Sequence, residues 1–379
     1  MILDDPVLVS ETELRGRLDR VRAEMAKKKI ATLAVYDSAQ HDMTSMDELF
    51  YLTDFYAVGP CWLVLQLEGR PTLFVSPAWD APRAKRLVSH ADVVPADAKG
   101  LMQAAAGALA QASPPFALCG GDALSVRAAE SFAGFALPGE NEIIPRLAAV
   151  KSPAEVARIA RAAEIADAGF ATLCQVARVG LREYELAAEV EATMKSLGAS
   201  DNFGLIAGGS HNTAVRGATE RRLEAGDVIV GEITPAFAGY HAQLCRTFVL
   251  GEPTPKTVEN FNILIEAERR AFAAALPGQS SSAIAEAANQ VITDGGYGEF
   301  CRPPYMRTRG HGLGRGSVLP GDLDPEGGPT LEEGMTFVIH PNQYFPDTGY
   351  LMLGDTVVIE RARPRVLTKT PAKLFWRAV

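Results

Sequence analysis

The stretch 231–248, GEITPAFAGYHAQLCRTF, constrains the fold most, because it predicts two short strands folded back on each other around Phe237-Ala238. Side chains alternate along a strand, so polar residues two apart share one face. Such a row of polar groups on a strand is unusual, and it indicates a metal site, a dismantled metal site or a solvated edge. The expected opposite pairs are Glu232 with Gln243 and Thr234 with His241, and the shared polar face holds His241, Gln243 and Cys245.

Composition restricts the possible classes of function. The chain has 379 residues, of which 47% are hydrophobic and 22% charged, the profile of a soluble globular protein with two or three domains. The formal net charge of −9 argues against a nucleic-acid partner, which would need a basic face. No apolar run approaches the roughly 20 residues that span a bilayer, so we expect no membrane segment.

Cysteine usage favours a reducing compartment. The five cysteines are scattered and form no CxxC pair, unlike a disulfide framework or a zinc–cysteine site. Residues 1–10, MILDDPVLVS, are acidic and lack the positive segment and apolar run of a secretory signal. We therefore expect a cytoplasmic protein.

Helix and strand patterns divide the chain into two domains. Strand patterns such as 31–37 and 61–76 alternate with helical ones, which predicts an α/β domain over residues 1–148. The Ser-Pro-Ala-Glu segment at 152–155 combines a good N-cap, a proline suited to the first helical position and a capping-box glutamate. Strand patterns dominate after two further helical stretches, so we expect an α+β domain with mostly antiparallel strands over residues 149–379.

Five segments together carry a resemblance to a known superfamily. They are YLTDF at 51–55, VKSPAEVARIARAAEIAD from 150, EAGDVIVGEITPAFAGYHAQLCRTFVLGEP from 224, RTRGHGLG at 307–314 and EEGMTFVIHPNQYFPDTGYLMLGDTVVIE at 332–360. Across nearly the whole chain, the sequence resembles the creatinase and Xaa-Pro peptidase superfamily, which shares the pita-bread fold with methionine aminopeptidases. The resemblance implies a creatinase-type N-terminal α/β domain, an α+β pita-bread C-terminal domain, a homodimer and a small-molecule substrate.

The resemblance also implies a metal site, but its ligands differ here. Family peptidases hold two metal ions with two Asp, one His and two Glu, and these positions fall in chain order on Glu232, Gln243, His311, His340 and Gly354. A two-metal site needs bridging carboxylates that neutralise its charge. Since Gln243 offers only a neutral oxygen and Gly354 no side chain, we expect the two-metal site to be lost.

The proton-handling histidine of the family is displaced as well. Its position falls at Val215 or Arg216, and the nearest histidine is His211, which stands in a His-Asn pair like that of creatinase. Either a shift of the loop brings His211 into the site, or Arg216 fills the position and His211 is a turn residue.

The main interpretation is a metal-independent hydrolase similar to creatinase, without a cofactor. It would cleave a C–N bond in a small nitrogenous substrate (amidino, amide or ureido), since a histidine titrating near neutrality can pass a proton from water to a leaving nitrogen. The expected catalytic residues are His211, Glu232, His311 and His340. The expected substrate-binding residues are His241, Gln243, Arg216, Tyr56, Trp62 and Cys245.

Two alternatives stay open. Glu232, His311 and His340 supply one carboxylate and two imidazoles, which suit a single Fe, Mn or Zn ion in a hydrolase or a lyase. The domain could instead be a non-catalytic binding module, although polar rather than apolar replacements at the ligand positions favour a working pocket. The sequence also leaves open the identity of the substrate and the choice between hydrolysis and elimination. It does not indicate which subunit supplies each wall of the pocket.

Three of the substrate-binding candidates have a structural alternative. Tyr56 and Trp62 follow the YLTDF segment, and each could stack on a planar or cationic ligand or simply pack in the core. Cys245 could be a nucleophile, but a buried inert thiol is the alternative, since reactivity needs a lowered pKa.

Overall fold

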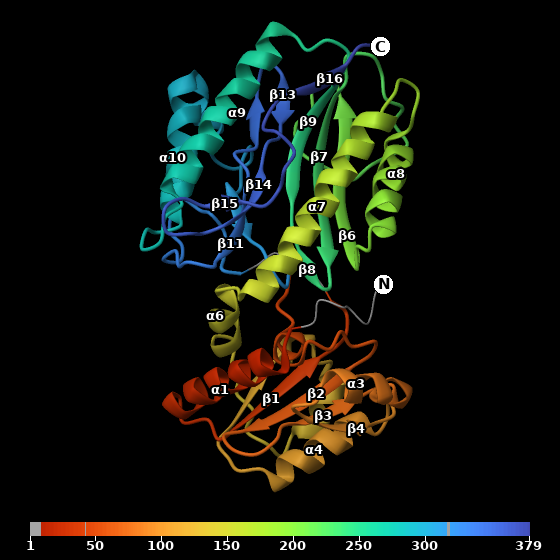
Figure 1. The fold of residues 1–379 in the computed structure, drawn as a ribbon, viewed down its shortest axis with the longest axis vertical. Helices are drawn as coiled ribbons and strands as arrows, with labels where there is room; N and C mark the ends of the chain where they lie inside the picture. Colours follow the sequence, from red (N-terminus) through yellow and green to blue (C-terminus); the bar gives the residue numbers. More distant parts are fainter. Residues whose placement is uncertain (1–8, 42, 317–318) are drawn as a thin grey trace. The chain divides into compact units, whose positions relative to one another are not determined.

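A computed structural model describes residues 9–41, 43–316 and 319–379, and these fall into two compact units. One unit ends at Ala149, and the other is Val150–Val379 (Figure 1). Residues 1–8, where a secretory signal would begin, lie outside the described residues.

The N-terminal unit contains a five-stranded mixed sheet in the order β4-β3-β2-β1-β5. Strand β1 pairs antiparallel with β2 and parallel with β5. Alternate residues of β1 lie on opposite faces, and Ala34 and Tyr36 pack with Trp62 and with α4 on one of them. The elements are α1 (Glu11–Lys27), β1 (Thr32–Asp37), α2 (Glu48–Thr53), β2 (Cys61–Gln66), β3 (Thr72–Val75), α3 (Ala81–Leu87), β4 (Asp92–Pro95), α4 (Leu101–Gln111), β5 (Phe116–Cys119), α5 (Val126–Ala129) and α6 (Ile143–Ala149).

The C-terminal unit begins with the long helix that its sequence signature predicts. Helix α7 (Pro153–Val176) starts with a complete capping box, in which Ser152 and Glu155 satisfy each other's backbone N–H groups. Helices α7 and α8 (Glu183–Ser196) lie over one face of a sheet in the order β16-β9-β7-β6 (Figure 1). Its strands are β6 (Asp201–Gly209), β7 (Val228–Phe237), β9 (Leu244–Leu250) and β16 (Phe375–Arg377), with β8 (Tyr240–His241) paired to β7.

The central hairpin forms, but its predicted pairing is wrong. Glu232 lies opposite Cys245 rather than Gln243, and His241 lies opposite Ala236 rather than Thr234. The turn is centred on Ala238 and Gly239, which both have positive φ, as the tightest hairpin turns require. Because the partners shift by two residues, each side chain keeps its expected face.

A second sheet of the C-terminal unit has the order β10-β11-β14-β15, and a separate hairpin joins β12 and β13. Backbone hydrogen bonds in both directions between Cys245 and Gly354 join β9 to the segment before β14. Buried Arg246 then pairs with Asp355 at 2.8 Å, so this junction is held by an ion pair. The remaining elements are α9 (Pro255–Ala274), α10 (Ser282–Ile292), β10 (Gly310–Gly312), β11 (Thr336–Ile339), β12 (Gln343–Phe345), β13 (Gly349–Leu351), β14 (Asp355–Val358) and β15 (Arg365–Val366).

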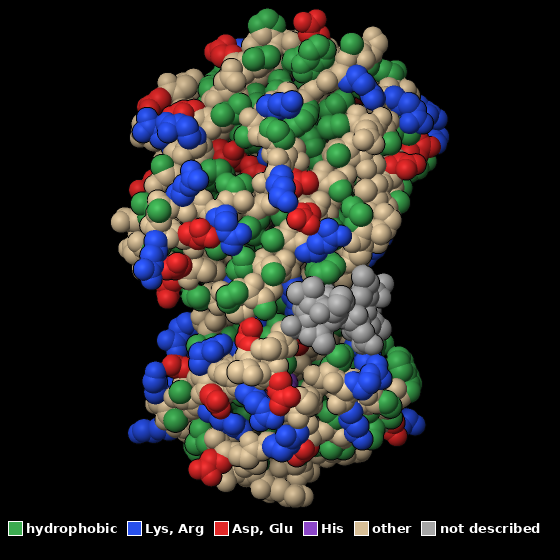
Figure 2. Space-filling view, viewed as in Figure 1, with side chains coloured by type: hydrophobic (Ala, Val, Ile, Leu, Met, Phe, Trp, Pro, Cys, Tyr) green, Lys and Arg blue, Asp and Glu red, His purple; other side chains and the backbone are tan. Residues whose placement is uncertain are grey.

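The units thus have the α/β and α+β character expected from the sequence. Within the described residues, no helix is both long and apolar enough to cross a membrane. Figure 2 shows basic and acidic side chains interspersed over the described part of the visible face.

Candidate active site

Four of the five expected ligand positions lie on, or directly next to, neighbouring strands of the C-terminal unit. Glu232 on β7 lies opposite Cys245 on β9, and Cys245 is hydrogen-bonded to Gly354. Gly354 in turn contacts His340, which follows β11, and β11 pairs with β10, which carries His311. The rings of His311 and His340 have centroids 5.6 Å apart.

Gly354 has no room for the side chain that the family places there. A Cβ atom built on this glycine would lie 2.4 Å from Cβ and 2.8 Å from Cα of His340. These are atoms that cannot rotate away, so the present backbone excludes a glutamate at this position. The close approach of the backbone at residues 340 and 354, rather than the histidine ring, therefore leaves the fifth position without a ligand.

Burial controls the charge of the site. Burial raises the pKa of Glu232 to about 7, and only the charge of Arg307 opposes this. Burial, followed by the neighbouring charge of His311, lowers the pKa of His340 to about 3. Burial also lowers the pKa of His311. Both imidazoles are therefore neutral at pH 7, the form in which histidine binds metal ions.

Several buried polar atoms of this region have no hydrogen-bond partner within the described residues. The donor and acceptor atoms concerned are Oε1 of Gln243, Nδ1 of His340, Nδ1 of His241 and Oγ1 of Thr234. Gln243 uses its other amide atom, which donates to Sγ of Cys245 at 3.4 Å. Buried polar groups are normally paired, so these atoms indicate a place where something polar or cationic binds.

The three residues of the one-metal alternative do not form a closed ligand cluster. His311 can bind a metal ion through Nε2, because its Nδ1 donates a hydrogen bond to the carbonyl of Gly312 at 3.1 Å and Nε2 keeps its lone pair. In the part of the chain that the structure describes, however, the ligating atoms of Glu232, His311 and His340 do not all lie within 4.8 Å of one another. An ion would have to draw these side chains together.

Tyr350 also belongs to this region, although it was not among the residues predicted for the site. Its hydroxyl is buried, and burial followed by the negative charge of Glu232 raises its pKa far above the usual range. No local sequence pattern distinguishes Tyr350 from other tyrosines in the closing hairpin.

Arg216 pairs with a buried carboxylate, which favours a structural role over the predicted substrate binding. Its guanidinium forms two hydrogen bonds with buried Glu183, at 2.6 and 2.7 Å. His211 is exposed on the loop after β6, with Nε2 3.0 Å from the carbonyl oxygen of Pro346 and its ring edge-on to Tyr344. The structure thus gives Arg216 a structural role and leaves His211 accessible.

The remaining candidates are divided between core and surface. Trp62 is 0% exposed and packs against Tyr36 and Phe132, so its interpretation as a ligand-stacking residue is wrong and core packing is observed. Tyr56 is partly exposed but already stacks on His41 at 3.6 Å. His241 and Cys245 are both buried. Burial raises the pKa of the Cys245 thiol far above its usual value, which fits an inert cysteine rather than a nucleophile.

Comparisons with known proteins identify both parts of the chain. Residues 157–361 match metallopeptidase family M24, and residues 17–141 match the creatinase/prolidase N-terminal domain. The chain is 32% identical to the Xaa-Pro dipeptidase of Pyrococcus furiosus over 238 residues, which are 62% of this chain and 67% of that protein.

Solved structures show the same two-domain fold. The prolidase from Pyrococcus furiosus superposes with a TM-score of 0.80 at 27% identity, covering 92% of this chain and 99% of that one. The Xaa-Pro dipeptidase from Bacillus anthracis superposes with a TM-score of 0.85 at 22% identity, covering 96% and 100%. The predicted creatinase-type N-terminal domain and pita-bread C-terminal domain are therefore confirmed.

These comparisons also correct the expected chemistry. An enzyme that hydrolyses C–N bonds is confirmed, since the family and its Xaa-Pro dipeptidase members have that activity. The expectation of a metal-independent enzyme without a cofactor is wrong, because the matching family is one of metallopeptidases. The chain belongs to metallopeptidase family M24, with a creatinase/prolidase N-terminal domain.

Proposed function

We propose that the chain is a hydrolase that cleaves a C–N bond in a dipeptide-like substrate and depends on one divalent cation. The observation that carries this proposal is the donor set at the family's metal positions. Glu232 supplies a carboxylate, and His311 and His340 supply neutral imidazoles, a combination that suits Mn, Fe or Zn. A cation would also compensate the buried charge of Glu232.

One cation fits this donor set better than two. A pair of metal ions needs carboxylates that bridge them, and Glu232 is the only carboxylate at the five positions. Gln243 offers a neutral oxygen, and Gly354 has no space for a side chain. The residues therefore do not fit the family's two-metal arrangement, but the donor chemistry of Glu232, His311 and His340 suits one ion that draws these side chains together.

The protein's own residues would bind and orient the substrate. When bound, a divalent cation supplies Lewis-acid activation of a carbonyl group or a water molecule. Two buried atoms that lack a partner within the described residues would form hydrogen bonds with polar groups of the substrate. They are Oε1 of Gln243 and Nδ1 of His241. Exposed His211 would carry a proton to the leaving nitrogen.

The substrate class, assembly and compartment belong to the same proposal. Relatives carry the name Xaa-Pro dipeptidase, which supports a dipeptide with a proline-like second residue as the first substrate to test. The resemblance to this family supports a homodimer. Five free cysteines, without a disulfide between them, support a reducing cytoplasm.

The test is metal content measured together with peptidase activity. We expect His311→Ala and His340→Ala each to lose one equivalent of metal relative to the unmodified chain, together with hydrolysis of Xaa-Pro dipeptides. His211→Ala serves as the matched histidine control and should keep the metal while activity falls. Equal metal content in all four proteins, with activity unaffected by chelators, would overturn the proposal.

A further inference from the structure

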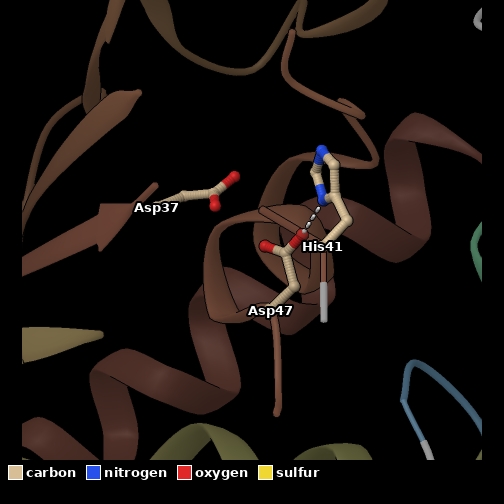
Figure 3. Close-up of side chains that lie close together, drawn as sticks. All are labelled: Asp37, His41 and Asp47. Carbon is tan, nitrogen blue, oxygen red and sulfur yellow. Dashed lines mark hydrogen bonds and ion pairs between the residues drawn. The ribbon is translucent and has the colours of Figure 1, made fainter. Parts of the chain in front are cut away.

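A second group of metal-ligating side chains lies in the N-terminal unit. Asp37 ends β1, Asp47 precedes α2, and His41 lies in the loop between them. One ligating atom from each of these residues lies within 4.8 Å of the other two. Figure 3 shows the carboxylate of Asp37 turned toward His41 and Asp47.

Each of the three side chains is held in place by a neighbour outside the group. Asp37 accepts a hydrogen bond from N–H of Ala39 at 2.7 Å, and Asp47 caps α2 by accepting from N–H of Phe50 at 2.8 Å. Each carboxylate uses Oδ1 for this contact. His41 stacks on Tyr56, so its ring orientation is restricted as well. The convergence is therefore built into the local fold.

The contacts of His41 show that a positive group belongs between it and Asp47. Nε2 lies 2.7 Å from the carbonyl oxygen of Ala57, which can only accept, so Nε2 carries a hydrogen. Nδ1 lies 3.0 Å from Oδ2 of Asp47, and the two side chains are only 8% and 7% exposed. Two buried lone pairs at this distance repel each other unless a proton or a cation lies between them.

The surroundings favour a cation over a proton. The three residues line a cavity of about 480 Å³, large enough for an ion with water molecules. Its lining contains further acidic groups and many neutral oxygens, and none of the lining residues that the structure describes is Lys or Arg. The other polar lining residues are Glu48, Asp122, Ser38, Gln40, Thr44, Ser45 and Asn141.

We propose that Asp37, His41 and Asp47 form a binding site for a divalent transition-metal ion, independent of the metal centre of the C-terminal unit. Two carboxylates and one imidazole suit Mn²⁺ or Zn²⁺ better than Ca²⁺ or Mg²⁺, which prefer oxygen alone. The hydrogen bond from Nε2 to Ala57 is the arrangement by which metal-binding histidines are fixed in one tautomer. Binding would tie the start of α2 to the end of β1.

The test is Mn²⁺ binding by the full chain, followed through the electron paramagnetic resonance signal of free Mn²⁺. The measurement uses a His311→Ala/His340→Ala background, in which the C-terminal centre cannot contribute. We expect one bound Mn²⁺ per chain. In Asp37→Asn and Asp47→Asn the amide oxygen can still accept the hydrogen bond of the turn or of the helix cap. Each variant should raise the dissociation constant for Mn²⁺ at least about tenfold.

Two further variants separate metal binding from folding. His41→Phe keeps an aromatic ring over Tyr56 but lacks both nitrogens, so it should lose Mn²⁺ binding. Glu68→Gln removes an exposed carboxylate of the same unit outside the cavity, and should bind Mn²⁺ as tightly as its parent. Mn²⁺ should raise the melting temperature of the parent and of Glu68→Gln, but not of His41→Phe.

Either of two results would overturn the proposal. One is no Mn²⁺ or Zn²⁺ binding by the background at millimolar metal, which would mean that a proton occupies the space between His41 and Asp47. The other is equal Mn²⁺ affinity in the parent, Asp37→Asn and Asp47→Asn. If the two background substitutions impair folding, Mn²⁺ binding is compared instead between the unmodified chain and Asp47→Asn alone. The single variant should then bind one Mn²⁺ fewer, or bind it more weakly.

Discussion

Gly354 lies directly against Cα and Cβ of His340, which leaves no room for a side chain at residue 354. A Cβ atom on residue 354 would lie 2.4 Å from Cβ of His340 and 3.0 Å from the carbonyl oxygen of Ile339. These atoms are present whichever side chain stands at residue 340, so the backbone itself excludes a ligand at residue 354. Reversion of Gly354 toward the family pattern should therefore disturb the fold.

Gly354→Ala tests this exclusion directly. The added methyl group meets backbone and Cβ atoms that cannot move without shifting a strand, so we expect the free energy of unfolding to fall by about 1–3 kcal/mol. Gly217→Ala is the matched control, since a Cβ there meets nothing within 4 Å, and it should change stability by less than about 0.5 kcal/mol. Urea unfolding measures both. Equal stability of the two variants would show that residue 354 can accept a side chain.

Gln243→Glu tests whether the site binds a cation. Gln243 is 1% exposed and Glu is its isostere, so the change adds a buried charge with little change in shape. Without metal, we expect the uncompensated charge to lower stability by about 1–3 kcal/mol. With metal, the second carboxylate should raise affinity about tenfold or more, as measured by metal titration and by unfolding at fixed metal concentration.

Gln290→Glu provides the control for charge alone, because this residue is exposed on α10. It should leave metal affinity unchanged. If Gln243→Glu also left affinity unchanged, the residues around Glu232 would not constitute the metal centre.

The sequence predicted the fold because its motifs are spread over both domains and because helix signals such as the capping box at Ser152 are local. The hairpin pairing was wrong because it depends on the turn centre. Gly239 was the signal for that centre, since a glycine readily supplies the positive φ that a tight turn needs. A one-residue error in the turn changes every partner by two.

The site was only partly predictable for a different reason. Ligand positions such as Glu232 and His311 follow from motifs, but the pairing of Arg216 with Glu183 joins residues 33 apart that no local pattern connects. The group of Asp37, His41 and Asp47 was missed because its spacing resembles that of an ordinary polar loop. Its convergence depends on the path of the loop, which only the structure shows.

Glu183 should make stability depend on pH. Burial alone would raise its pKa, but hydrogen bonds from Arg216 and Thr219 outweigh this and lower the pKa to about 2 from the usual 4.5. A lowered carboxyl pKa stabilises the fold above the unfolded-state value and loses that contribution as pH falls toward the folded-state value. The stabilisation is therefore complete above about pH 5 and disappears between pH 4.5 and about 2.

Glu183→Gln removes this contribution. We expect the variant to be less stable than the unmodified chain by about 2–3 kcal/mol at pH 7, with a difference that shrinks as the pH approaches 2. Urea unfolding across this pH range measures it, with Glu189→Gln on the exposed side of the same helix as the control. A difference that did not change with pH would assign the loss to packing rather than to charge.

Ala238 and Gly239 permit a test of the observed hairpin turn. Both have positive φ, at 47° and 77°, where a residue with a Cβ atom is strained by about 1–2 kcal/mol. Ala238→Gly should relieve that strain and, after the added flexibility of the unfolded chain, stabilise the protein by about 0.5–1 kcal/mol. Gly239→Ala should destabilise it by about 1 kcal/mol. Thermal unfolding of the two variants measures these changes in stability. In a turn centred on Phe237-Ala238, Gly239 would lie at the end of the turn. The two substitutions would then not have opposite effects on stability, which would contradict the observed turn.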